Sequence, residues 1–122
     1  MAIGVLGAAP AFAQGGYTSY IYNWLPGKES SHWTDGNTDS VSTSVQFSGC
    51  SVTSGSFSYA GLQLKKEVNN LPDTVVNRDN NYCDTSSFGD KAAGKYYFNY
   101  SSLNGQDTVS AAFSVSTVTV RY

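Results

Sequence analysis

The chain has 122 residues, with seven basic and nine acidic side chains and a formal net charge of −2 at pH 7. This length fits one domain. A weak negative charge excludes the basic surface that nucleic acid or anionic lipid requires. After residue 13, no apolar run approaches the roughly 20 residues that a membrane-spanning helix needs, so we expect no membrane span.

The first 13 residues resemble the end of a secretory signal peptide. They are apolar and finish with Ala11-Phe12-Ala13 before Gln14. Small residues at those two alanine positions are what signal peptidase requires. A buried strand or helix is the alternative. We expect residues 1–13 to be a signal-peptide remnant of bacterial style, and the mature protein to be secreted and extracellular.

An aromatic-rich stretch follows at residues 14–37. A strand that is apolar on both faces must be buried on both, or it invites aggregation. The stretch is therefore either an extra strand of its own domain or an extended segment that docks onto a partner. Its large side chains are the candidate partner-binding residues: Tyr17, Tyr20, Ile21, Tyr22, Trp24, Leu25 and Trp33.

Residues 38–122 have the composition of an all-β domain, rich in Ser, Thr, Tyr, Val and Gly. Alternation and turn residues predict strands at 41–47, 56–66, 74–77, 94–100 and 109–122. We expect a bulge at Ala60-Gly61 and turns at 78–81 and Asn104-Gly105. The change of parity between Val115 and Val118 indicates either a bulge near Ser116 or a strand that is partly covered on both faces. This pattern predicts an antiparallel, immunoglobulin-like β-sandwich of six to eight strands.

The core of that sandwich is predicted from the inward parity of each strand. Its expected members are Val45, Phe47, Tyr59, Leu62, Leu64, Tyr96, Phe98, Phe113, Val118 and Val120. Cys50 and Cys83 are the two cysteines of the chain. In an exported protein such a pair is expected to form a disulfide that ties two strands or sheets.

Nothing in the sequence favours catalysis, a metal or a cofactor. His32 is the sole histidine and sits in a polar stretch. A disulfide would remove the thiolate that a cysteine nucleophile needs. The Asn- and Asp-rich residues 79–84 favour a turn over a calcium loop, because they lack the central Gly and terminal Glu of such loops. We predict no catalytic residue, no metal ligand and no cofactor.

The layout of leader, extended segment and compact β-domain resembles the small adaptor subunit of secreted umbrella-toxin particles. The resemblance implies that residues 15–37 dock into a lectin-bearing partner. It also implies that the domain from Thr38 to Tyr122 sits on the stalk of a large polymorphic toxin. The resemblance is one of organisation and carries no residue motif.

Three binding functions remain open. The leading one is a non-catalytic interaction or adaptor module, which binds another secreted or cell-surface protein through the aromatic segment and strand edges. A second is an inhibitor of an extracellular hydrolase that presents the loop Leu25-Pro26-Gly27-Lys28. The third is a carbohydrate-binding module, which would bind polysaccharide through aromatic side chains gathered on one exposed face.

Overall fold

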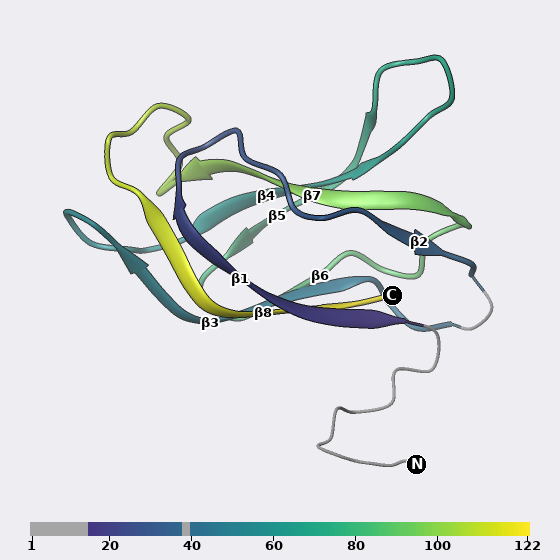
Figure 1. Cartoon of the computed structure of the whole chain (residues 1–122), viewed down its shortest axis with the longest axis horizontal. Helices are drawn as coiled ribbons and strands as arrows, with labels where there is room; N and C mark the ends of the chain where they lie inside the picture. The colour runs from purple at the N-terminus through teal and green to yellow at the C-terminus, as the bar shows by residue number, and fades with distance from the viewer. Residues whose placement is uncertain (1–14, 38–39) are drawn as a thin grey trace, which may run out of the picture.

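The computed structural model describes residues 15–37 and 40–122, which form two antiparallel β-sheets packed face to face (Figure 1). The first sheet has the strand order β1-β8-β3-β6, and the second has the order β2-β7-β4-β5. The strands are β1 Gly16–Trp24, β2 Trp33–Asp35, β3 Ser44–Val52, β4 Ala60–Lys66, β5 Thr74–Asn81, β6 Thr85–Ser87, β7 Gly94–Leu103 and β8 Phe113–Arg121. The predicted all-β sandwich is confirmed.

Aromatic side chains from both sheets fill the space between them. Tyr96, Phe98 and Tyr100 point inward from β7 and are buried, as the alternation of that strand predicts. Phe113 of β8 meets the Tyr100 ring at 5.0 Å and the Phe47 ring at 5.9 Å, measured between ring centroids. Full burial of one such side chain contributes about 1.5–3 kcal/mol, so the core rests on these contacts.

Nine of the ten predicted core residues are buried. Tyr59 is the exception, because its ring is only half-buried and lies 5.2 Å from the Tyr82 ring. Several core residues were not predicted: Ile21, Trp33, Ala60, Phe88, Tyr97, Tyr100, Leu103 and Val115.

Of the two alternatives for the strand around Ser116, the structure has the bulge. Phe113 and Val115 face inward, then the inward set changes parity after the exposed residues Ser116 and Thr117. The register of β8 against β1 shifts at the same place. Gly49 lies nearby in β3 with φ of +74°, and a Cβ there would lie 2.0 Å from the Ser116 hydroxyl oxygen. Glycine is therefore required beside the bulge.

Two further predictions of local structure hold. The β4–β7 register shifts between Gly61 and Leu62, which confirms the predicted bulge. Asn104 and Gly105 form a two-residue turn with φ of +52° and +86°. Two positive φ values are what the tight turn favoured by Asn-Gly requires.

Several predicted boundaries are corrected. β3 runs from Ser44 to Val52 rather than over 41–47, and β4 begins at Ala60 rather than at 56. β5 continues to Asn81, so the turn predicted at 78–81 is wrong. The Asn81 side-chain oxygen accepts hydrogen bonds from the backbone N–H groups of Cys83 (2.9 Å) and Asp84 (3.0 Å), and it thereby stabilises the turn after it.

The disulfide between Cys50 and Cys83 is confirmed, with 5.9 Å between the two Cα atoms. Cys50 belongs to β3 of the first sheet, and Cys83 lies in the turn after β5, the edge strand of the second sheet. The bond therefore fastens one side of the sandwich. For a separation of 33 residues, loop-closure entropy predicts a stabilisation of about 3–4 kcal/mol.

The segment predicted at residues 14–37, ahead of the domain at 38–122, contributes two strands to the sandwich, so of its two alternatives the structure has the extra strand of its own domain. β1 pairs with β8 from Gly16 opposite Arg121 to Trp24 opposite Phe113, and β2 pairs with β7. The apolar stretch thus buries its inward side chains in its own domain. The predicted signal remnant, residues 1–13, lies outside the described residues.

Candidate binding site

β1 forms one edge of the first sheet. β8 pairs with one side of it, and no other strand of residues 15–37 or 40–122 flanks the opposite side. The β1–β8 register shifts on both sides of Ile21, and Asn23 has φ of +53°. Such irregularities protect an edge from uncontrolled pairing. β1 is therefore an accessible but irregular edge.

Exposed aromatic surface concentrates on this edge. Tyr20 and Tyr22 are 69% and 72% exposed, and Leu25, just after the strand, is 46% exposed. Among the described residues the other large exposed apolar side chains are Leu71 and Tyr82. The described chain thus places most of its exposed large apolar side chains within one six-residue stretch.

Two of the seven predicted binding residues are core residues instead. Ile21 and Trp33 are 3% and 4% exposed. The Trp33 ring stacks on Tyr122 with centroids 5.7 Å apart and lies 6.2 Å from the Tyr17 ring. Trp33 therefore offers no surface to a partner, because its side chain fills the space between the sheets, whereas Ile21 can be reached only from a cavity beneath β1.

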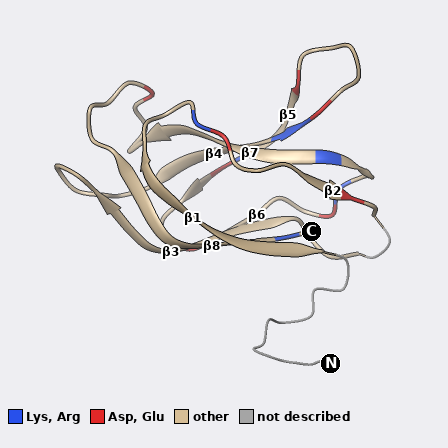
Figure 2. Cartoon of the chain, in the orientation of Figure 1, with Lys and Arg blue, Asp and Glu red and all other residues tan. Residues whose placement is uncertain are grey.

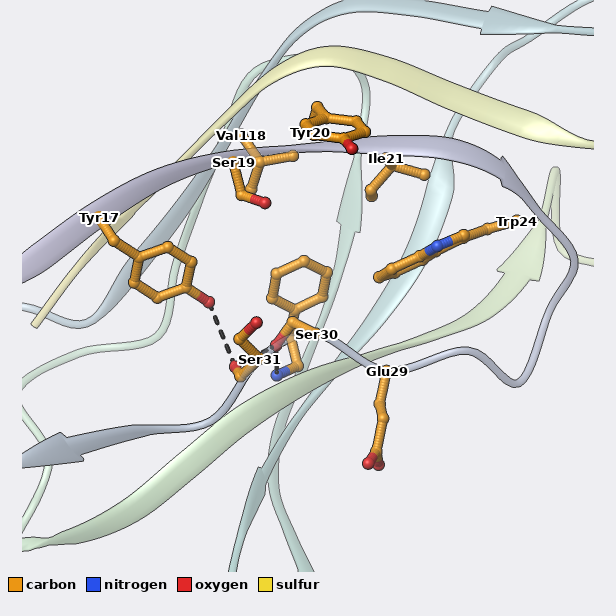
Figure 3. Close-up of a pocket in the computed structure, with 10 residues that line it drawn as sticks. Tyr17, Ser19, Tyr20, Ile21, Trp24, Glu29, Ser30, Ser31 and Val118 are labelled. Atoms are coloured by element: carbon orange, nitrogen blue, oxygen red, sulfur yellow. Dashed lines mark hydrogen bonds between the residues drawn. The ribbon is translucent and has the colours of Figure 1, made fainter.

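A small cavity of about 140 Å³ lies between β1 and residues 29–31. Figure 3 shows Tyr17, Ser19 and Trp24 on the side of β1 that faces these residues, while the Tyr20 ring lies on the opposite side of the strand. The cavity sits where the edges of the two sheets approach each other. It therefore lies directly beneath the accessible edge of β1.

The cavity has an apolar floor made by Ile21, Phe98 and Val118. Trp24 forms one wall, with its ring centroid 6.3 Å from that of Phe98. An apolar cavity of about 150 Å³ holds one benzene molecule. The cavity under β1 therefore has room for one apolar side chain of similar size.

Polar groups close the cavity on the side of the second sheet. The Tyr17 hydroxyl donates to the Ser31 carbonyl oxygen at 3.2 Å, and burial raises the pKa of that hydroxyl. Ser30 is fixed to β7, because its N–H donates to the Phe98 carbonyl oxygen (2.8 Å) and its hydroxyl accepts from the Phe98 N–H (3.0 Å). The Glu29 side chain is 53% exposed and borders the cavity. Hydrogen bonds therefore hold this wall of the cavity in place.

The outer face of the second sheet carries a cluster around His32. The imidazole stacks on Tyr97 with centroids 4.0 Å apart and planes inclined by 5°. Its Nδ1 contacts the Glu67 carboxylate, and its Nε2 lies 3.3 Å from a carboxylate oxygen of Glu29. The Tyr97 hydroxyl donates to Asp73 at 2.5 Å. We call these five residues the His32 cluster.

Four of the seven predicted binding residues line the cavity: Tyr17, Tyr20, Ile21 and Trp24. Tyr22 and Leu25 are exposed, and Trp33 belongs to the core. Ser19 and residues 29–31 were not among the predicted binding residues. Ser19 lies two residues from both Tyr17 and Ile21, so strand parity could have predicted that it shares their face. Residues 29–31 had no such signal, because they reach the site through backbone bonds to β7.

Comparison with protein-family models, with curated proteins and with solved structures found no match to this chain. In residues 15–37 and 40–122, no group of three or more His, Cys, Asp and Glu side chains could hold a metal ion. The same residues contain no helix with the length and hydrophobicity of a membrane span. The site is therefore described by its own geometry.

Proposed function

We propose that this chain is a secreted, non-catalytic interaction module that binds another secreted or cell-surface protein at the edge of β1. One observation carries the proposal: Tyr20, Tyr22 and Leu25 are exposed together on an unpaired sheet edge, beside a cavity of about 140 Å³. Clustered aromatic anchors next to a pocket dominate the energy of many protein interfaces. The binding needs no cofactor.

An extended segment of the partner would add a strand to β1. Main-chain hydrogen bonds supply affinity in this mode, and pockets for alternate side chains supply specificity. Successive side chains of an added strand point to opposite faces. One set would pack on Tyr20 and Tyr22, and the other would face the cavity, which accommodates one apolar side chain.

The binding edge is preformed. β1 is ordered by its pairing with β8, and Gly15 and Tyr122 exchange backbone hydrogen bonds at 3.0 and 3.1 Å. A partner would therefore bind without the cost of ordering the segment, about 1–2 kcal/mol for each backbone residue fixed. The role of adaptor that the umbrella-toxin resemblance implies stays a prediction, as does the inhibitor alternative.

Secretion is part of the proposal. The disulfide between Cys50 and Cys83 is compatible with an oxidising compartment, because such bonds are rare in the cytosol. The signal-like residues 1–13 are the second support.

A capture experiment with matched variants tests the proposal. Residues 15–122 would be immobilised and exposed to culture medium of the producing organism. The Tyr20→Ala/Tyr22→Ala variant should lose the captured protein, with Kd raised at least about tenfold in calorimetry. The Leu71→Ala/Tyr82→Ala variant removes equally exposed side chains elsewhere and should retain it. Equal capture by both variants would contradict the proposal.

A second candidate function is supported by the outer face of the first sheet. Thr18, Thr119, Gln46 and Thr85 form one row across its four strands. Arg121 is the only charged residue in those strands, and Figure 2 shows the other charges over the second sheet and the loops. Hydroxyl and amide groups beside two exposed tyrosines fit a neutral polysaccharide.

Retention on insoluble polysaccharide decides between the two. A carbohydrate-binding module is retained by cellulose or chitin and is released when Tyr20 and Tyr22 become Ala. A protein-binding module passes through both materials. The capture experiment then identifies its partner.

A further inference from the structure

The wall of the cavity and the His32 cluster share Glu29. Glu29 and Ser31 line the cavity, and His32 follows directly in the chain. Backbone bonds to β7 hold this segment as far as Ser30, and β2 begins at Trp33. Between these fixed points, Ser31 and His32 are held by their own side-chain and carbonyl contacts. The contacts of His32 therefore act on the cavity wall.

Both ring nitrogens of His32 face carboxylates. Nδ1 contacts Glu67, which follows β4, and Nε2 faces Glu29 of its own segment at 3.3 Å. A neutral imidazole donates from only one nitrogen and would direct the lone pair of the other at a carboxylate. Only the imidazolium donates to both. The geometry therefore fits a protonated His32 that bridges the two glutamates.

The remaining charged neighbours are on β4, β7 and the loop before β5. Tyr97 stacks beneath the imidazole and donates to the Asp73 carboxylate. The Lys65 ammonium lies 5.9 Å from the Tyr97 ring centroid and opposes a positive charge on His32. The two carboxylates, in contrast, contact the imidazole directly. The surroundings of the imidazole favour its charged form.

The pKa of His32 follows the same reasoning. Partial burial by itself lowers that pKa, but hydrogen bonds and charges from Glu67 and Glu29 outweigh burial, and the pKa lies above its ordinary 6.5. Because the pKa is raised in the folded state, the contact of His32 with Glu67 and Glu29 contributes its full stabilisation of the fold below pH 6.5. Its contribution is lost as pH rises through the folded-state value.

We propose that protonated His32 is a latch that fastens the cavity wall to the second sheet, and that its deprotonation at higher pH loosens Ser31 and weakens partner binding at β1. The latch rests on the proposed binding function. Loss of the bridge releases Glu29 and Glu67 from each other. The Ser31 carbonyl still accepts from the hydroxyls of Tyr17 (3.2 Å) and Ser30 (2.9 Å), but the residue that follows it is no longer fastened to Glu67, and the closed end of the cavity loosens.

An NMR titration of the free chain tests the latch without any partner. His32 is the sole histidine, so its ring signals are unambiguous. Its midpoint should lie above pH 6.5. Glu67→Gln and Glu29→Gln should each lower it by about one pH unit. The Asp107→Asn variant removes the same charge from the loop after β7 and should leave it unchanged. A midpoint at or below 6.5, or equal effects of all three variants, would overturn the latch.

Coupling to the cavity is read from the amide signals of Ser31 and Tyr17. In the wild type these signals should shift with the same midpoint as His32, and in His32→Gln that transition should be absent. Signals that do not change with pH in the wild type would also overturn the latch.

With the captured protein, Kd should rise at least about fivefold from pH 6 to pH 9, and His32→Gln should abolish this dependence. Binding that depends on Tyr20 and Tyr22 but not on pH leaves the binding function intact and rejects the latch. The expected NMR behaviour, combined with a capture experiment that retains no protein, supports the latch and rejects the binding function.

Discussion

Outward-facing tyrosines occur on both sheets, but their surroundings differ. Tyr97 points out of the second sheet and is nonetheless 3% exposed, because His32 stacks on it and its hydroxyl donates to Asp73. Tyr20 and Tyr22 point out of the first sheet and are 69% and 72% exposed. A tyrosine that points out of a sheet is therefore not always accessible to a partner. An uncovered tyrosine on an edge is the better candidate for binding.

Among the substitutions, replacement of the covered tyrosine should have the largest effect on stability. Tyr97→Ala should lower the free energy of unfolding by about 3 kcal/mol, as expected for an aromatic side chain removed from a packed site. Denaturant unfolding followed by fluorescence measures the change. A loss below about 1 kcal/mol would show that the cover on Tyr97 is loose, and the contrast between the two sheets would disappear.

Alkaline pH should reduce the stability next. Burial is the main cause that raises the pKa of Tyr97 above its ordinary value, with a further contribution from Asp73, and burial raises the pKa of Tyr100 to about 12. Both contributions are fully present below pH 10, because the folded chain retains protons that the unfolded chain releases above it. Stability should fall above pH 10 by up to about 1.4 kcal/mol per pH unit for each group. Unfolding curves between pH 9 and pH 12 check this, and a flat profile would contradict it.

Removal of the hydrogen-bond acceptor of Tyr97 should have a smaller effect. Asp73→Ala should cost about 1–2 kcal/mol, because a hydrogen bond to a charged group is lost. It should also lower the pKa of Tyr97, since Asp73 raises that pKa. Absorbance titration of the tyrosines reports the pKa, and the Asp79→Ala variant in β5 is the control. An unchanged titration would exclude Asp73 as the acceptor in solution.

The exposed tyrosines should matter least for the fold. Tyr20→Ala and Tyr22→Ala should each change the free energy of unfolding by less than about 0.5 kcal/mol. The same unfolding experiment as for Tyr97 makes the comparison direct. Losses above about 2 kcal/mol would mean that these side chains stabilise the domain, and the binding assignment would lose its basis.

Much of the fold follows from local pattern. Alternation in β7 predicts the inward set, and the parity change in β8 indicates the bulge near Ser116 as one of two alternatives, because period and burial are coupled along a strand. The Asn104-Gly105 turn is equally local. Asn81 was misassigned because its residue type favours a turn but does not say whether it lies in the turn or bonds to it from the strand before.

The site was less predictable. Alternation places Tyr97 outward, and only the tertiary contacts of His32 and Asp73 explain why it is buried. The segment 14–37 was open to two readings, because an aromatic pattern does not reveal whether its inward side chains pack on the same chain. Ile21 and Trp33 settle that point for β1 and β2: they complete the core, while Tyr20 and Tyr22 remain outside it.

The central claim is that β1 is a preformed edge rather than a mobile arm. Amide hydrogen exchange on residues 15–122 without a partner tests it most directly. The account predicts that the β1 amides bonded to β8 are protected to a degree similar to those of β3, the other neighbour of β8. Exchange of residues 16–24 at the rate of an unstructured chain, with β3 protected, would contradict it and restore the arm that orders only on binding.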